Sequence, residues 1–193
     1  MMKNTLLIIS ILIFAIGGLS ASELDPNVKT TAAKTIMIIF DQTINAPVDV
    51  VLKDAKGFKL LEESLNSKDA KSRKYNLKNL PVGNYTLEIH EDFKITTESI
   101  TIDNDAVIVT DEDVTFKPVC SQTQDHWNIN LLLLQKDADI IIYNTDEKPV
   151  YSAKFRGEQN VAQSFDISKL DKGNYNAVIT VEGMTFREPV FVR

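Results

Sequence analysis

One short pattern occurs twice in this sequence, and it limits the folds that the chain can adopt. The pattern reads LPVGNYTLEI at positions 80–89 and LDKGNYNAVI at positions 170–179. Each copy has a turn followed at once by a strand in which apolar and polar residues alternate. Glycine supplies the positive φ that tight turns need, and asparagine tolerates it. We therefore expect a structural role for the repeated turn residues: Gly83, Asn84, Tyr85, Gly173, Asn174 and Tyr175.

The two turns lie 173 − 83 = 90 positions apart, and this offset aligns apolar with apolar residues over a long span. Val50–Leu52 match Ile140–Ile142, and Tyr75 matches Phe165. A slip of one residue would send every side chain of a strand to the other face of its sheet. The constant offset therefore predicts a tandem duplication of one β module, in which each copy is large enough to be a small domain.

Alternating segments separated by turn residues predict short strands in both modules. Segment 60–65 also fits a helical turn, but its counterpart in the second copy alternates clearly, so we expect a strand. No amphipathic helix separates the segments, and the predicted fold class is all-β, two tandem immunoglobulin-like antiparallel β sandwiches. The expected strands are 35–40, 48–54, 58–65, 73–79, 84–91, 94–102, 128–134, 138–144, 150–156, 163–167, 174–182 and 184–192.

The start of the chain has the features of a cleaved secretory signal peptide at residues 1–21. Lys3 gives a positive n-region, 6–16 are apolar, and 17–21 are small residues suited to cleavage. The apolar run is too short for a transmembrane helix, so we expect no membrane span in the mature chain. Polar residues 22–34 are expected to form an irregular leader before module one at 35–103.

The segment 104–124 joins the modules, and module two is expected at 125–193. The joining segment has two strand-like pieces, 106–110 and 114–119, which Asp111-Glu112-Asp113 separates. These pieces could be extra edge strands or a paired linker, and the sequence leaves both alternatives open.

Composition argues against several kinds of site. The formal net charge is −6 and the basic residues 68–74 form one short cluster, so we expect no nucleic-acid binding. Cys120 is the single cysteine and cannot form an intramolecular disulfide, and we interpret it as an incidental thiol. His90 and His126 have no partner at zinc-ligand spacing. We therefore predict no metal site and no cofactor.

The search for chemistry leaves a non-enzymatic protein as the expectation. No serine lies in a Gly-x-Ser-x-Gly elbow, and the sequence has no glycine-rich phosphate loop. The acidic segments 103–105 and 111–113 could offer oxygens to calcium, but they lack the glycine and distal glutamate of the calcium-loop motif. Trp127 has no aromatic counterpart at the matching strand start, which makes it a weak candidate for a binding contact.

The last third of the chain carries residues typical of a known family. They are the tyrosine-ended strand 140–144, the Asp-Ile-x-x-Leu-x-x-Gly-x-Tyr run at 166–175, and the terminal strand 190–193. These features resemble the immunoglobulin-like C-terminal sorting domain of the type IX (Por) secretion system. They are also similar to short secreted or periplasmic proteins built from one or two such sandwiches. In the family pattern a glycine is usual in the turn where this chain has Glu147-Lys148.

The resemblance implies export in a Gram-negative bacterium, to the periplasm, the cell surface or the extracellular space. The expected function is a non-enzymatic β-sandwich protein that acts as an interaction or structural module at the surface or envelope. Its partners would be the outer-membrane secretion machinery or other envelope proteins. One alternative is a type IX substrate whose C-terminal module is a sorting signal, often cleaved later. Another is a calcium-binding or enzymatic protein that uses the acidic linker.

Overall fold

The computed structural model describes residues 26–40, 44–66 and 71–193, so the predicted signal peptide lies outside the described residues. Every regular element in these ranges is a β strand. Within the same ranges, no helix is long and apolar enough to span a membrane. The chain divides into two compact units, with the boundary between Thr115 and Phe116. We call them the first and second unit.

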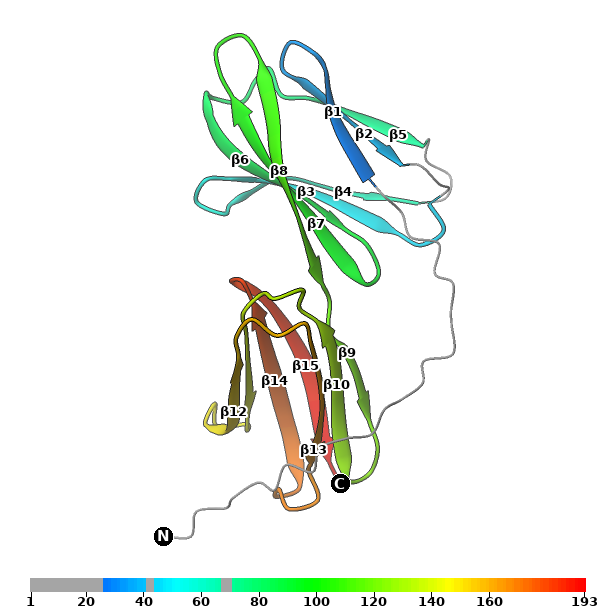
Figure 1. The fold of residues 1–193 in the computed structure, drawn as a ribbon, viewed down its shortest axis with the longest axis vertical. Helices are drawn as coiled ribbons and strands as arrows, with labels where there is room; N and C mark the ends of the chain where they lie inside the picture. The colour runs from blue at the N-terminus through cyan, green and yellow to red at the C-terminus, as the bar shows by residue number, and fades with distance from the viewer. Residues whose placement is uncertain (1–25, 41–43, 67–70) are drawn as a thin grey trace. The chain divides into compact units, whose positions relative to one another are not determined.

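The first unit is a sandwich of a three-stranded sheet, in the order β1-β2-β5, and a five-stranded sheet, in the order β4-β3-β6-β7-β8 (Figure 1). All the pairings for which a register is defined are antiparallel. Its strands are β1 (Pro26–Ala32), β2 (Thr35–Phe40), β3 (Val48–Asp54), β4 (Lys59–Leu65), β5 (Ser72–Asn76), β6 (Gly83–His90), β7 (Lys94–Ile102) and β8 (Val107–Phe116).

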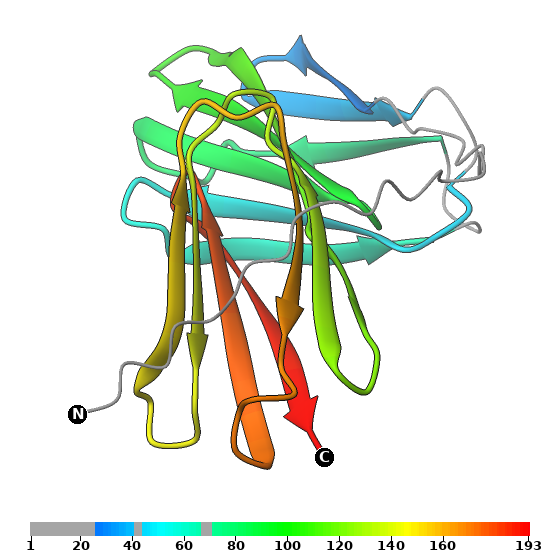
Figure 2. The same ribbon diagram turned by 60° about the horizontal axis from the view of Figure 1, so that its bottom comes forward.

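The second unit pairs a three-stranded sheet, β13-β10-β9, with a four-stranded sheet, β12-β11-β14-β15 (Figure 2). Its first, second and fifth strands thus form one sheet, and the other four form the facing sheet, as in immunoglobulin-like sandwiches. The strands are β9 (Val119–Gln122), β10 (His126–Leu132), β11 (Ala138–Tyr143), β12 (Pro149–Phe155), β13 (Asn160–Asp166), β14 (Gly173–Val181) and β15 (Met184–Val192). The predicted fold class is therefore confirmed.

Each unit has its own apolar core between its two sheets, because every second residue of a central strand points inward. In β11, for example, Ala138, Ile140 and Ile142 are buried, whereas the residues between them are half-buried. The core of the first unit contains Ile36, Ile38, Val50, Leu87 and Ile100, and the core of the second contains Trp127, Ile129, Ile140, Phe165 and Ile179, among others.

The two units have closely matching strand pairings. Val50 pairs with Ile89 in the first unit, and Ile140 pairs with Ile179 in the second, which preserves the offset of 90. The offset differs at β10. Tyr75 pairs with Ile36 and its counterpart Phe165 pairs with Trp127, so that this strand is offset by 127 − 36 = 91. The duplication itself stays a prediction.

The expected irregular leader at 22–34 is wrong for the part that the structure describes. Pro26–Ala32 form β1, which pairs with β2, and the Thr30 hydroxyl donates a hydrogen bond to the Val107 carbonyl at 3.0 Å. The sequence of β1, PNVKTTA, has a single large aliphatic residue, Val28, which packs on the core. An edge strand that contributes so little to the core has no period-2 signal to find.

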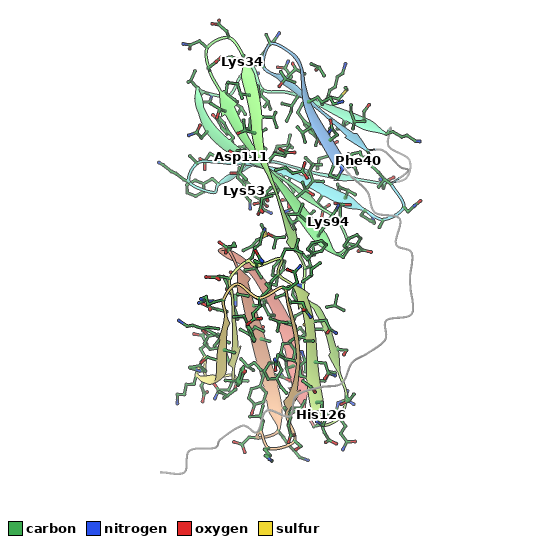
Figure 3. The ribbon with its side chains drawn as sticks, viewed as in Figure 1. Lys34, Phe40, Lys53, Lys94, Asp111 and His126 are labelled. Carbon is green, nitrogen blue, oxygen red and sulfur yellow. The ribbon has the colours of Figure 1, made fainter. Side chains whose placement is uncertain are left out.

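The joining segment 104–124 forms edge strands, so the linker alternative is not needed. The piece expected at 106–110 and the first half of the piece expected at 114–119 belong to one ten-residue strand, β8, which continues through Asp111-Glu112-Asp113. Asp111 lies within it at a φ of 56°, a left-handed residue inside the strand (Figure 3). Residues of β9 then pair with β10, and only Lys117 and Pro118 separate β8 from β9.

Candidate functional site

A hydrogen-bonded turn precedes each Gly-Asn-Tyr sequence, and its polar and apolar residues have different structural roles. In the second unit, Asp166 Oδ1 accepts hydrogen bonds from the Ser168 hydroxyl at 2.6 Å and the Ser168 amide at 3.0 Å. These two bonds lower the pKa of the Asp166 carboxyl. Ile167, next to Asp166, is buried in the core, and the Leu170 amide donates to its carbonyl at 3.1 Å.

The first unit contains the same turn with different surface residues. Asn76 Oδ1 accepts from the Lys78 amide at 3.0 Å, and the Leu80 amide donates to the Leu77 carbonyl at 3.0 Å. The inward-facing Leu77 is 4% exposed. The spacing Asx-Leu/Ile-x-x-Leu thus encodes a capped turn in which the second and fifth side chains anchor to the core.

The tyrosine of each Gly-Asn-Tyr sequence fixes the end of this turn. The Tyr175 hydroxyl donates to the Asp171 carbonyl at 2.8 Å, and the Tyr85 hydroxyl donates to the Pro81 carbonyl at 2.7 Å. A tyrosine at the start of the sixth strand that bonds to the backbone a few residues upstream is the tyrosine corner of immunoglobulin-like sandwiches. Each tyrosine thus holds its own turn by a hydrogen bond to the turn backbone, and the structural role of the whole turn stays a prediction.

The glycines and asparagines of the same turns begin strands β6 and β14. Gly83 and Gly173 have φ values of 159° and 157°, which residues with side chains rarely adopt, although both sites have space for a Cβ. The Asn84 side chain accepts a hydrogen bond from the Thr101 hydroxyl at 3.2 Å, and Asn174 is exposed. The backbone conformation, rather than a lack of space, explains why glycine occupies both positions.

The turn between β11 and β12, where this chain lacks the usual glycine, keeps a backbone conformation that favours glycine. Asn144 Oδ1 accepts from the amides of Asp146 at 3.1 Å and Lys148 at 2.9 Å. Glu147 has a φ of 57°, the left-handed conformation that normally favours glycine. The equivalent residue in the first unit is Gly57, with a φ of 83°. The turn geometry is therefore kept, and only the preferred residue is missing.

The outer edge of β15 is closed by a side chain from the facing sheet. Gln122 Nε2 donates to the Phe191 carbonyl, and the Phe191 amide donates to Gln122 Oε1 at 3.1 Å. This amide group satisfies both backbone groups of one edge residue. Sequence patterns did not identify Gln122, because a single glutamine in a short polar strand carries no periodic signal.

Trp127 is not a surface contact, which corrects the sequence prediction. Its side chain is 1% exposed, and its ring centroid lies 5.2 Å from that of Phe165. With an offset of 90, Trp127 would align with the half-buried Met37, but with the observed offset of 91 it aligns with buried Ile36. One residue of slip exchanges the two faces of a strand, so a constant offset of 90 would place Trp127 on the wrong face.

The two histidines lie in different units. His90 Nε2 is 2.7 Å from Glu88 Oε2, and Lys53 also pairs with Glu88. Burial opposes ionisation of Glu88, but its bonds to His90 and Lys53 outweigh burial and lower its pKa. His126 is exposed at the start of β10 (Figure 3). Across residues 26–40, 44–66 and 71–193, no three metal-ligating side chains form a group suited to an ion.

The acidic segment 103–105 and the cysteine are explained by local structure. Asp103 Oδ1 caps the turn after β7 by accepting from the Asp105 amide at 2.8 Å and from the Ala106 amide, and these bonds lower its pKa. Cys120 is half-buried in β9 and packs on the core. Burial, with a smaller contribution from Glu188, raises the pKa of its thiol to about 12, which disfavours a reactive thiolate.

Solved structures match this chain only at low similarity. A segment of two fibronectin type-III domains from chicken tenascin is 10% identical, with 87% of this chain and 98% of that chain covered and a TM-score of 0.31. Chicken CNTN1 FN1–FN3 domains are 7% identical, with 88% and 66% covered and a TM-score of 0.29. The BSP domain of a biofilm associated protein is 15% identical, with a TM-score of 0.29.

The match to the biofilm-associated protein covers 86% of this chain but only 29% of that chain. The search of curated proteins yields no significant match. The family comparison gives a specific result for one part of the molecule. Residues 123–192, which include every strand from β10 to β15, match the family described as the secretion system C-terminal sorting domain.

Proposed function

We propose that this is an exported protein in which the second unit is the address read by a type IX secretion machine. The first unit is then the exported part, and it acts without enzymatic chemistry through its surface at the cell envelope or outside the cell. The observation that carries the proposal is the family match at residues 123–192, which spans the second unit.

The contrast between the two units supports an address in the second unit. Both have the capped turn and the tyrosine corner, so these features alone do not distinguish them. The reported family match lies wholly within the second unit. What a receptor would use to discriminate must therefore include residues that differ between the units.

The exposed residues of the turn supply such a difference. Ser168-Lys169 and Asp171-Lys172 are exposed in the second unit, whereas the first unit presents Lys78-Asn79 and Pro81-Val82 at the same places. The anchoring residues beneath them are alike in both units. A turn of fixed shape with unit-specific side chains is well suited to recognition by a rigid receptor, because little conformational entropy is lost on binding.

The proposal is tested by ending the chain after Phe116 in cells that have a type IX machine. We expect the shortened protein to remain in the periplasm, whereas the intact chain becomes accessible to protease added outside the cell. Far-UV circular dichroism of the purified shortened chain shows whether its first unit is folded. A matched control, Gly83→Ala, perturbs the corresponding turn of the first unit and should leave surface arrival intact.

Arrival of the folded, shortened chain at the cell surface as efficiently as the intact chain would contradict an address in the second unit. It would favour the alternative of a two-sandwich envelope protein that is exported by another route.

A further inference from the structure

Three of the four edge strands of the second unit carry a feature that discourages pairing with another strand. β15 has Pro189 and the Gln122 side chain on its outer edge. β12 begins with Pro149 and has an irregular register with β11 next to Tyr143. β9 has only four residues. Proline, irregular pairing and short length are common ways in which proteins protect sheet edges.

β13 differs from these three strands. Its seven residues, NVAQSFD, pair with β10 without a break in register, and they contain neither proline nor glycine. The only charged residue is Asp166 at its end. A regular, uncharged edge strand of this length is suited to pairing with another strand.

The hydrogen bonds of β13 identify which backbone groups are available. The Leu133 amide donates to the Gln159 carbonyl at 3.0 Å, and the Ile167 amide donates to the Asp125 carbonyl at 2.8 Å. Along an antiparallel strand, every second residue points its amide and carbonyl at the same neighbouring strand. The odd-numbered residues of β13 therefore form their backbone hydrogen bonds with β10. The amides and carbonyls of Asn160, Ala162, Ser164 and Asp166 therefore face the outer edge. Their side chains lie on the outer face of the sheet.

The equivalent edge strand of the first unit is β5, and charged side chains protect it. There the guanidinium of Arg73 and the hydroxyl of Tyr75, both on β5, bond to Glu63 on β4. The pairing register places Gln163, Phe165 and Ala153 at these three positions in the second unit. Their side chains carry no charge. Tyr151 instead packs edge-on against Phe165, with ring centroids 4.8 Å apart.

We propose that β13 is a docking edge for a second copy of this chain, paired antiparallel about a twofold axis. The two three-stranded sheets would then form one continuous sheet of six strands. This interface goes beyond the export function proposed above and does not depend on it.

The sequence of β13 is self-complementary in one register. When Ala162 lies opposite Ser164 of the second copy, Asn160 lies opposite Asp166 of the second copy. All four outward-facing residues then take part in paired backbone hydrogen bonds. The opposed side chains are small or polar, and an asparagine amide can donate to the facing carboxylate.

Charge selects a second copy as the occupant. Two β13 strands meet without like charges facing each other over 160–165, because this stretch is uncharged. Two copies of β5 would instead bring Arg73 and Lys74 close to their own counterparts. Like charges directly opposite across strands are destabilising. Self-pairing is thus favoured at β13 and disfavoured at its equivalent in the first unit.

The test is sedimentation equilibrium of the purified protein over a wide concentration range, with two double variants. In Ala162→Lys with Ser164→Lys, introduced lysines face each other twice across the twofold axis, and dimerisation should weaken about tenfold or more. In Ala162→Lys with Ser164→Asp, each lysine faces an aspartate, and dimerisation should return. The control Ser121→Lys places a charge on the same outer face but on β9, and should leave the dimer unchanged.

Circular dichroism of each variant verifies that the sandwich is intact. A wild-type chain that stays monomeric at every concentration would overturn the proposal, whatever other partner the edge meets. A dimer that both double variants leave equally strong would also overturn it, since the contact would then lie elsewhere.

Discussion

The carboxyl group of Glu98 is the most perturbed acid in the structure, and it makes the stability of the first unit depend on pH. Glu98 lies on β7 directly opposite the core residue Leu87, and its side chain is 5% exposed. Burial, with a further contribution from the negative charge of Glu112, raises its pKa from 4.5 to about 7. The folded first unit therefore holds this proton at pH values where the unfolded chain has lost it.

The sign of the pH effect follows from proton binding. Between pH 4.5 and 7 the folded state binds more protons than the unfolded state at this site, so the free energy of unfolding falls as the pH rises. The difference of about 2.5 pKa units corresponds to at most about 3 kcal/mol, fully lost above pH 8. Relaxation around the charge reduces this value, and we expect about 1–3 kcal/mol.

Glu98→Gln removes the titration and keeps the shape of the side chain. Relative to wild type, we expect the variant to become more stable by about 1–3 kcal/mol on going from pH 4.5 to pH 8. Urea unfolding followed by far-UV circular dichroism measures this change. Trp127, the single tryptophan, marks the separate transition of the second unit by its fluorescence.

The matched variant Glu112→Gln removes only the smaller cause of the raised Glu98 pKa, the nearby negative charge. Its free energy of unfolding should still fall as the pH rises, but less than that of wild type. The reasoning is refuted if Glu98→Gln and wild type differ by the same free energy at pH 4.5 and pH 8. The Glu98 carboxyl would then titrate normally in the folded chain.

Four further substitutions test the second unit and its counterpart. Glu147→Gly should raise the free energy of unfolding by about 0.5–1 kcal/mol, because it relieves a left-handed residue; Gly57→Ala should lower that of the first unit by a similar amount, and unchanged stability in both would contradict the turn argument. Tyr175→Phe should cost about 1 kcal/mol through the lost bond to the Asp171 carbonyl, as followed by tryptophan fluorescence. Trp127→Ala should cost about 3–5 kcal/mol by circular dichroism, and a loss below 1 kcal/mol would contradict its core position.

Strands with a buried face could be predicted closely from sequence. The expected strands 48–54 and 94–102 have the same limits as β3 and β7. In β3 the inward residues Val48, Val50 and Leu52 are aliphatic at period 2, whereas β7 has this pattern only at Ile100 and Ile102. The ambiguous segment 60–65 is also a strand, as its second copy indicated. Strands that contribute little to a core were either missed, as β1 was, or divided in two, as β8 was. β1 has one large aliphatic residue, and β8 continues through three acidic residues.

The candidate site was only partly visible in the sequence. The tyrosines of the repeated turn were recognised as structural, but their hydrogen bonds to residues four positions earlier need a structure. Trp127 was singled out because it has no aromatic counterpart, but its counterpart in the observed pairing, Ile36, is aliphatic and equally buried. The Gln122 contact with Phe191 joins positions 69 residues apart, and no local pattern encodes such a pair.

The central claim is that the second unit directs export through a type IX machine. The most direct measurement compares the intact chain in cells with a working machine and in otherwise identical cells that lack the outer-membrane translocon. Protease added outside the cells, followed by quantitative mass spectrometry of peptides from the first unit, reports where the protein is. The account predicts degradation in the first cells and protection within the periplasm in the second. Equal degradation in both would contradict it.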